Sequence, residues 1–302
     1  MQPLLATTAI AVSMFGSIAS AQTQAGGVPV HMVVTAEPVQ GSALAAISRG
    51  DVAAWQGPTR LPVTEWLPLQ GDKAELELYI LIDERVDPSQ AALFEQLRRF
   101  VSDQPPSTAV GIAYMFNGEA HIARTPTKDH ALAAQALRVS SGSESAAASP
   151  FMSLSALVNG WASGAPRREV LAVTDGIDRF GDFGDLNMYV GQTVADVQRA
   201  GVVVFCMYAP SLGHAAHSPA LIRWGQTYLG QVAEETGGEA YLSGSIEPFL
   251  ADLNRHLAHQ YQITFLAPPS SGAVFQAVRF TTEVPNVDLL SAYGFYVRAP
   301  SE

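Results

Sequence analysis

The sequence predicts an α/β protein with a doubly wound, mostly parallel sheet of the Rossmann-like class and an additional β-unit formed by the two flanks of the chain. Three observations predict it. Four apolar runs of strand length lie between residues 75 and 259. Segments of helical period separate these runs, which is typical of a parallel sheet with helices on both faces. The flanks instead carry short apolar pieces separated by Gly and Pro, which is typical of strands and turns.

The predicted sheet strands are almost continuously apolar, as expected for strands that are buried on both faces. They run from Leu76 to Ile82, Val110 to Phe116, Val170 to Thr174 and Val202 to Tyr208. The only cysteine, Cys206, lies inside the last run and is expected to be a small core residue.

Four helices are expected between or after these strands. The first places five apolar residues on one face, and Asp87 and Pro88 supply an N-cap and a first helical residue. Two further helices end at Gly201 and at Gly237, because glycine often follows the last turn of a helix. The last helix has apolar residues at helical spacing from Ile246 to Leu257. The serine-rich stretch from Val139 to Pro150 is expected to be a loop.

The domain organisation follows from these patterns. Residues 28–70 form an N-terminal β segment, residues 75–259 form the α/β domain, and residues 260–298 form a C-terminal β segment. We expect the two β segments to pack together, with the α/β domain inserted between them.

The N-terminus indicates export. No charged residue precedes Glu37, and the apolar residues 4–18 lead to Ala19-Ser20-Ala21, an Ala-x-Ala cleavage signal. Residues 1–21 are therefore predicted to be a signal peptide, and the mature protein is expected to be periplasmic or secreted. The alternative is an uncleaved anchor, although the run is short for a membrane span. No later run is long enough to span a membrane.

The amino-acid composition restricts the class of macromolecule that this protein is expected to bind. The chain has 302 residues, 48% of them hydrophobic, and its 28 acidic and 17 basic residues give a net charge of −11. Such an acidic balance argues against nucleic acid as a partner.

Two strand ends carry acidic residues where a ligand would bind. In a doubly wound sheet, ligands bind beyond the carboxyl ends of the strands, where the winding reverses. Asp83 follows the first strand and Asp175 follows the strand that begins at Val170. We expect these two aspartates to face each other at the reversal.

At these residues the chain resembles the von Willebrand factor type A (vWA) family, in particular the VWFA-related domains of bacterial exported proteins. The resemblance spans residues 28–298. Its motifs, in chain order, are Arg49-Gly50-Asp51-Val52, Leu81-Ile82-Asp83, Val173-Thr174-Asp175-Gly176, Glu235-Thr236-Gly237-Gly238, Gln260-Tyr261-Gln262-Ile263-Thr264-Phe265 and Tyr293-Gly294-Phe295-Tyr296.

The resemblance implies a metal-ion-dependent adhesion site, in which an Asp-x-Ser-x-Ser loop, a threonine and a later aspartate hold a divalent cation. This chain keeps Asp83 and Asp175, but Arg85 and Asp87 replace the two serines, and no counterpart of the threonine can be assigned. One hypothesis is a degenerate site in which Arg85 lies between the aspartates and replaces the cation. The alternative is an atypical Mg²⁺ or Ca²⁺ site of Asp83, Asp87 and Asp175, with Arg85 pointing to solvent.

The expected function is that of a non-enzymatic module that binds another macromolecule, a protein, through the loops above the sheet. These loops are residues 84–88, 140–150, 177–191 and 211–224. The chain lacks the common hydrolase, phosphate-binding and dinucleotide-binding motifs. The alternatives are a cation-dependent adhesion module and a hydrolase on the same scaffold, for which the acidic loop after Asp175 and His214 are the first suspects.

The histidines give no metal site on their own. His256 and His259 are three residues apart on the last predicted helix, and His214 and His217 lie in a predicted loop. A zinc site needs a third protein ligand, and the sequence assigns none. We therefore expect these histidines to be solvated or to cap helices.

Overall fold

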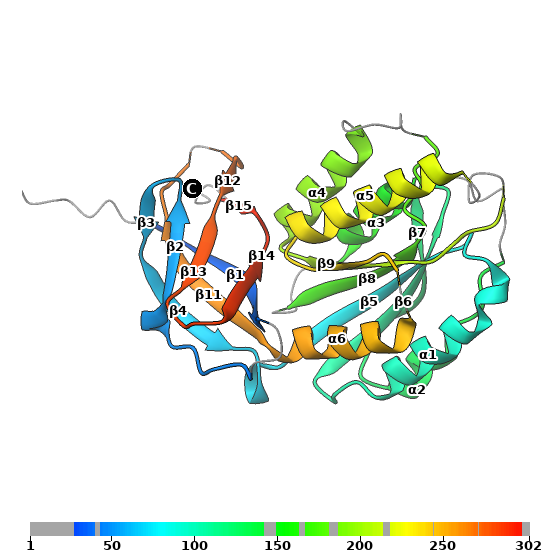
Figure 1. The fold of residues 1–302 in the computed structure, drawn as a ribbon, viewed down its shortest axis with the longest axis horizontal. Helices are drawn as coiled ribbons and strands as arrows, with labels where there is room; N and C mark the ends of the chain where they lie inside the picture. Colours follow the sequence, from blue (N-terminus) through cyan, green and yellow to red (C-terminus); the bar gives the residue numbers. More distant parts are fainter. Residues whose placement is uncertain are drawn as a thin grey trace, which may run out of the picture.

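A six-stranded sheet forms the centre of the α/β domain (Figure 1). The computed structural model describes residues 27–39, 43–141, 149–162, 167–180, 187–213, 218–243, 245–270 and 272–297. In spatial order the strands of this sheet are β10 (Ala240–Tyr241), β9 (Val203–Tyr208), β8 (Arg168–Thr174), β5 (Leu76–Asp83), β6 (Thr108–Phe116) and β7 (Glu119–Thr127).

The strand order confirms the predicted fold class. All neighbouring strands are parallel except β6 and β7, which are antiparallel. Counted in chain order from the β7 edge, the strands run 3-2-1-4-5-6, the order of a doubly wound sheet. The winding reverses between β5 and β8, which are direct neighbours.

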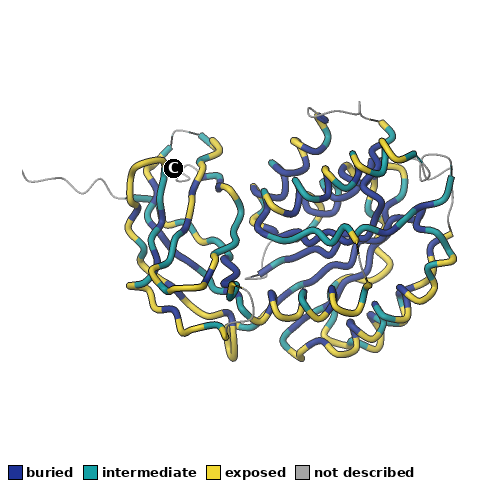
Figure 2. Tube along the Cα trace, in the orientation of Figure 1, coloured by how far each residue is buried: buried dark blue, intermediate teal, exposed yellow. Residues whose placement is uncertain are grey.

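Helices cover both faces of the sheet. One face packs against α1 (Ala91–Ser102), α2 (His130–Gln135) and α6 (Ile246–Ala258), and the other against α3 (Pro150–Gly160), α4 (Met188–Ala200) and α5 (Pro219–Glu235). Alternate residues of β5 serve the two cores, since Ile80 and Ile82 face the first layer and Tyr79 and Leu81 face the second. Figure 2 shows that the central strands β5, β8 and β9 are buried along nearly their whole length.

The structure adds three elements that the sequence pattern did not predict. These are β7, α2 and α3. Strand β7 forms the edge of the sheet and is mostly exposed, so it lacks an apolar run. The first predicted helix also begins differently, because Asp87 caps a 3₁₀ turn (Pro88–Gln90) that precedes α1. The α4 helix ends at Gly201 in the left-handed conformation.

The two flanks of the chain form the β-unit. Its four-stranded sheet has the order β14 (Val287–Ser291), β1 (Val28–Pro38), β11 (Gln260–Ala267) and β4 (Val63–Pro68). A three-stranded sheet is formed by β13 (Arg279–Thr282), β2 (Val52–Gln56) and β3 (Thr59–Leu61), and β12 (Phe275–Ala277) pairs with β15 (Gly294–Tyr296). In the four-stranded sheet, strands of the N-terminal and C-terminal flanks alternate (Figure 1).

Aromatic side chains fill the core of the β-unit. Phe265 packs edge-on against Phe280 and Phe295, with ring centroids 5.6 and 5.1 Å apart. Trp66 stacks on Tyr261 across the β4–β11 pair. The Trp66–Tyr261 contact joins the two flanks, and residues of both flanks share one hydrophobic core.

The β-unit and the α/β domain meet where α6 continues into β11. The backbone N–H of Ala36 donates to the carbonyl of His259 (3.0 Å), and that of Tyr293 donates to the carbonyl of Glu235 (3.2 Å). Across the described ranges, no helix is both long and apolar enough to cross a membrane. The predicted signal peptide, residues 1–21, lies outside the described residues.

Candidate functional site

The reversal point of the sheet brings Asp83 and Asp175 together. Asp83 is the last residue of β5, and Asp175 directly follows β8, the neighbouring strand. Both carboxylates are buried. The hydroxyl of Thr174 donates to Oδ2 of Asp83 over 2.7 Å and so joins the two strand ends.

Each carboxylate oxygen of the pair accepts a hydrogen bond from the protein. Oδ1 of Asp83 accepts from the backbone N–H of Arg85 (2.9 Å), and Oδ1 of Asp175 accepts from that of Ile177 (2.9 Å). Oδ2 of Asp175 accepts from the Ser211 hydroxyl and from Nη2 of Arg179 (3.2 Å). The pair is therefore held by groups of three loops.

Arg85 is buried beside this pair. Its Nη2 donates to the carbonyl of Leu212 (3.1 Å), while Nε and Nη1 have no hydrogen-bond partner among the described residues. The positive charge of Arg85 works against the rise in pKa of both Asp83 and Asp175. The guanidinium thus acts on both carboxyl groups without pointing to solvent.

The ion pair at Asp175 comes from a residue that the sequence analysis did not single out. Nη2 of Arg179 lies 3.2 Å from Oδ2 of Asp175, and Nη1 donates to the carbonyl of Ile177 (2.9 Å). The spacing of four residues after the aspartate was the available signal. This spacing is informative only when the conformation of the turn after β8 is known, because that turn brings Arg179 back to Asp175.

Burial raises the pKa of both aspartates. Desolvation is the main cause for each, and the nearby charge of Asp83 raises the pKa of Asp175 further. The hydrogen bonds from Thr174 and Ser211 oppose the rise. The two carboxyl groups therefore favour sharing a proton or facing a cation.

The side chain of Asp87, the third predicted ligand, stabilises the turn in which Asp87 itself lies. Its Oδ1 accepts from the backbone N–H of Ser89 over 2.8 Å. Its own N–H donates to the carbonyl of Pro210 (2.9 Å). Asp87 thus anchors the loop after β5, with its carboxylate turned to the start of the helix.

The loops above the aspartates are tied to one another and form a rim. The Ser140 hydroxyl donates to the carbonyl of Asp83 (3.0 Å), and the Ser149 hydroxyl donates to the carboxylate of Asp178 (3.0 Å). Glu84 pairs with Arg138. We use the name rim for residues 84–88, 140–141, 149–152, 177–180, 187–191 and 211–213. Residues 142–148, 181–186 and 214–217, which belong to the predicted binding loops and include His214 and His217, lie outside the described residues.

Two large apolar side chains of the rim are more than half exposed. Phe180 is 57% exposed in the loop after β8, and Met188 is 74% exposed at the first position of α4. Both lie in the predicted binding loop of residues 177–191. Exposed apolar side chains that gather in one patch are typical of binding surfaces.

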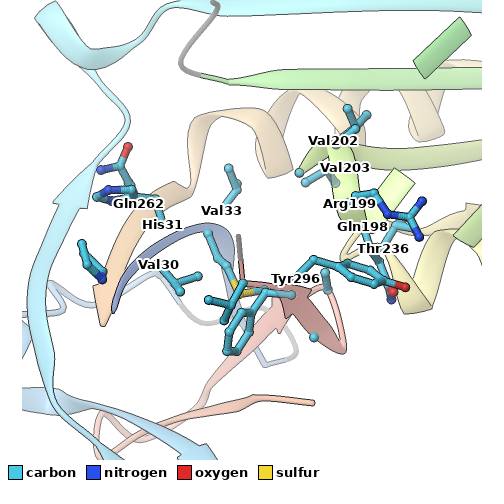
Figure 3. A pocket seen from close by; sticks show the side chains of 18 of the residues that line it. Val30, His31, Val33, Gln198, Arg199, Val202, Val203, Thr236, Gln262 and Tyr296 are labelled. Carbon is cyan, nitrogen blue, oxygen red and sulfur yellow. The ribbon is translucent and has the colours of Figure 1, made fainter. Parts of the chain in front are cut away.

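A separate cavity of about 470 Å³ lies between the β-unit and the α/β domain (Figure 3). Side chains of β1, β15 and the turn between α4 and β9 surround it, among them Val30, Val202 and Tyr296. The cavity lies at the amino end of β9, whereas the rim lies at the carboxyl ends of the strands. Neither Asp83 nor Asp175 lines it.

Of the two histidines expected on the last helix, His256 differs from the expectation and His259 does not. His256 is buried in the junction with the β-unit and faces two glutamates, Glu37 and Glu239. His259 ends α6 and offers its backbone carbonyl to β1. The sequence analysis missed both glutamates because they come from distant segments of the chain.

The chain matches no protein-family model and no curated protein. Among solved structures it resembles an aerotolerance-related membrane protein from Bacteroides fragilis (16% identity, 60% of this chain and 98% of that chain, TM-score 0.44). It also resembles the SpRpn10 VWA domain (12% identity, 59% and 95%, TM-score 0.34). A third is the N-terminal part of the type V pili tip protein Mfa5 from Porphyromonas gingivalis (16%, 51% and 27%, TM-score 0.29).

These likenesses concern the fold. The α/β domain has a doubly wound, mostly parallel fold. The strand order 3-2-1-4-5-6, the antiparallel edge strand and the aspartates at the reversal point are the features of this chain on which that description rests. Asp83 and Asp175 lie at the carboxyl ends of β5 and β8 in this sheet.

Proposed function

We propose that this protein is an exported, non-enzymatic module that binds a protein partner through the rim of its vWA-like domain. The observation that carries the proposal is the exposure of Phe180 and Met188 on the rim. Apolar anchors at the centre of an interface contribute most of the binding energy in protein complexes. The net charge of −11 favours a protein over a nucleic acid as the partner.

We propose further that binding needs no divalent cation at the rim, because the adhesion site is degenerate. Mg²⁺ and Ca²⁺ need several free oxygen ligands. Here all four oxygens of Asp83 and Asp175 already accept protein hydrogen bonds. The guanidinium groups of Arg85 and Arg179 supply positive charge at the same place, so these residues fit a divalent cation poorly.

The proposal places the protein outside the cytoplasm after removal of residues 1–21. This location rests on the signal-peptide pattern of the sequence. The partner should therefore be sought among extracytoplasmic proteins.

The test has two stages. The immobilised chain first captures partners from an extracytoplasmic fraction, with and without a chelator, and mass spectrometry identifies them. The purified partner is then titrated against the wild type, against a Phe180→Ser/Met188→Ser double variant, and against Val274→Ser. Val274 is a matched control because it is also 57% exposed but lies in the β-unit.

We expect the rim double variant to weaken binding by about tenfold or more, since removal of an interface anchor typically costs at least 1–2 kcal/mol. The Val274→Ser variant and the chelator should leave the affinity unchanged. Equal affinity for the wild type and the rim variant would show that the partner binds elsewhere. Loss of binding in chelator would contradict the degenerate site.

A further inference from the structure

The first half of β1 has an edge that no described strand covers. On one side, β11 pairs with residues 28–35 of β1. On the other side, β14 pairs only with residues 34–38, because the chain after Ser291 turns to the α/β domain and pairs with Thr236. Along residues 28–33, the second edge of β1 therefore has no neighbouring strand within the described part of the chain.

The hydrogen bonds of β1 show which backbone groups face this open edge. The N–H of Ala36 donates to the carbonyl of His259, directly before β11. The N–H of Val39 donates to the carbonyl of Asn286, directly before β14. The hydrogen-bonding direction alternates from residue to residue along a strand. Even-numbered residues of β1 therefore direct their backbone groups to β11, and odd-numbered residues direct theirs to the opposite side.

His31 and Val33 each direct an N–H and a carbonyl to the open edge. Pro29 directs only its carbonyl there, because proline has no N–H, and proline in a sheet is typical of such edges. At a rise of about 3.3 Å per residue, the backbone from Pro29 to Val33 spans roughly 13 Å. An exposed edge is a template for an added strand unless a charge or a bulge prevents pairing. The register of β1 with β11 is continuous along these residues.

The cavity of about 470 Å³ lies along this edge (Figure 3). Residues 28–33 of β1 line one side, and Val202 and Val203 after α4 line the opposite side. Phe295 and Tyr296 of β15 add aromatic surface. Ligand cavities typically have volumes of about 300–1,000 Å³. The space beside β1 therefore suits a single extended segment with apolar side chains rather than a folded domain.

The charge on the cavity wall is opposite to that of the whole protein. Arg199 is the only Lys, Arg, Asp or Glu among the described residues that line the cavity, whereas the chain has a net charge of −11. The guanidinium lies 4.7 Å from the ring centroid of Tyr296 and forms an ion pair with Asp196 (2.9 Å). Since the side chain of Arg199 is 47% exposed, it remains accessible to a ligand carboxylate.

We propose that the open edge of β1 binds an extended segment of a protein partner as an added strand. The backbone of the segment pairs with His31 and Val33. Its apolar side chains lie against Val202 and Phe295, and an Asp or Glu side chain faces Arg199. This surface is distinct from the rim, because it lies at the amino end of β9, and the inference does not depend on the function proposed for the rim.

The experiment selects peptides from a random decapeptide phage library on the immobilised full chain. Peptides that bind the Phe180→Ser/Met188→Ser variant as tightly as the wild type are kept, which excludes ligands of the rim. These peptides should combine strand-forming apolar residues with at least one acidic residue. Fluorescence polarisation of synthetic peptides then measures the effect of N-methylation at each backbone position. Affinity should fall about fivefold to tenfold at alternate positions, because each methyl group there removes a hydrogen bond to β1.

Two pairs of variants locate the binding site. His31→Pro removes the N–H from the open edge, whereas His31→Ala removes the same imidazole and keeps the N–H. The peptide should bind the proline variant about fivefold to tenfold more weakly than the alanine variant. Arg199→Gln should weaken binding about threefold, as expected for an exposed ion pair. Arg255→Gln is its matched control, because Arg255 is also 47% exposed and pairs with an aspartate three residues earlier, but lies outside the cavity.

If His31→Pro fails to fold, the N-methyl scan and the two arginine variants decide. Failure to select any peptide whose affinity depends on alternate backbone N–H groups overturns the proposal. Equal affinity for His31→Pro and His31→Ala also overturns it, because the peptide would then bind elsewhere. In place of peptide binding, binding of dodecanoate in the cavity or dimerisation that His31→Pro abolishes would identify another occupant and would overturn it as well.

Discussion

The hydroxyl of Thr174 donates to the carboxylate of Asp83 over 2.7 Å, across the line where the winding of the sheet reverses. The same hydroxyl accepts the backbone N–H of Gly176 (3.2 Å). One side chain at the end of β8 thus fixes both the aspartate that ends β5 and the turn that carries Asp175. The geometry of the rim depends on this buried contact.

Thr174→Val should therefore destabilise the protein. Valine has nearly the same shape but leaves one oxygen of a buried carboxylate and the backbone N–H of Gly176 without these hydrogen bonds, which costs about 2–3 kcal/mol. Urea unfolding of the two proteins measures the difference. Thr174→Ser keeps the hydroxyl and should recover most of the stability. Thr227→Val, which removes a hydroxyl from the exposed face of α5, should change stability by no more than about 0.5 kcal/mol. Equal costs at positions 174 and 227 would contradict the role given to Thr174.

The turn after β8 packs against a glycine of α5. A Cβ atom at Gly225 would lie 2.3 Å from the backbone oxygen of Asp175, so no side chain fits there. Gly225→Ala should cost about 1–3 kcal/mol by overpacking and should displace the turn that holds Asp175. Gly230, five residues further along the same helix, has nothing within 4 Å of an added Cβ.

The matched change Gly230→Ala should stabilise the protein by about 0.5–1 kcal/mol, because alanine is the better helix former. Thermal or urea unfolding of both variants tests the pair. Opposite signs are expected. A stabilising Gly225→Ala would show that α5 does not pack against the turn as closely as described.

A buried glutamate makes stability depend on pH. Glu169 of β8 is fully buried, and burial raises its pKa to about 7, against the attraction of Arg167 at 3.9 Å. Because the folded-state pKa lies above the ordinary value of 4.5, the folded state holds a proton that the unfolded state releases. Its contribution to stability is full below the ordinary pKa and is lost as the pH rises through about 7.

Glu169→Gln should flatten this part of the pH profile. The free energy of unfolding of the wild type should fall between about pH 5 and about pH 8 more steeply than that of the variant. Asp83 and Asp175 also have raised pKa values and contribute with the same sign in both proteins, so the difference isolates Glu169. Parallel profiles for the two proteins would show that Glu169 is ionised throughout this range.

The sheet could be predicted because its strands obey simple periodicities. Ile80 and Leu81 are apolar for the same reason, since helices cover both faces of β5. Strand β7 could not be predicted this way, because it lies at an edge and carries mostly exposed side chains. The position of β7 depends on its pairing with β6, and a local sequence pattern carries no information about that pairing.

The candidate site also has a part that could be predicted from the sequence and a part that could not. Asp83 and Asp175 could be found from the sequence because strand ends and the reversal of winding determine where they lie. The pairing of Asp175 with Arg179 depends on the conformation of one turn, and the Glu37–Glu239–His256 cluster depends on how the β-unit packs against α6. Neither leaves a periodic signal in the sequence.

We propose that positive charge from the protein replaces the cation at Asp83 and Asp175. Thermal unfolding of the wild type and of Arg85→Ser, each with and without excess Mg²⁺ or Ca²⁺, tests it most directly. The wild-type Tm should not change, whereas Arg85→Ser, which restores a serine of the adhesion motif and removes the buried positive charge beside the carboxylates, should gain stability with the cation. That gain reaches about 2.7 kcal/mol at a hundredfold excess over the Kd. A rise in the wild-type Tm, absent from an Asp83→Asn variant, would contradict the claim, because the site would then bind the cation despite Arg85.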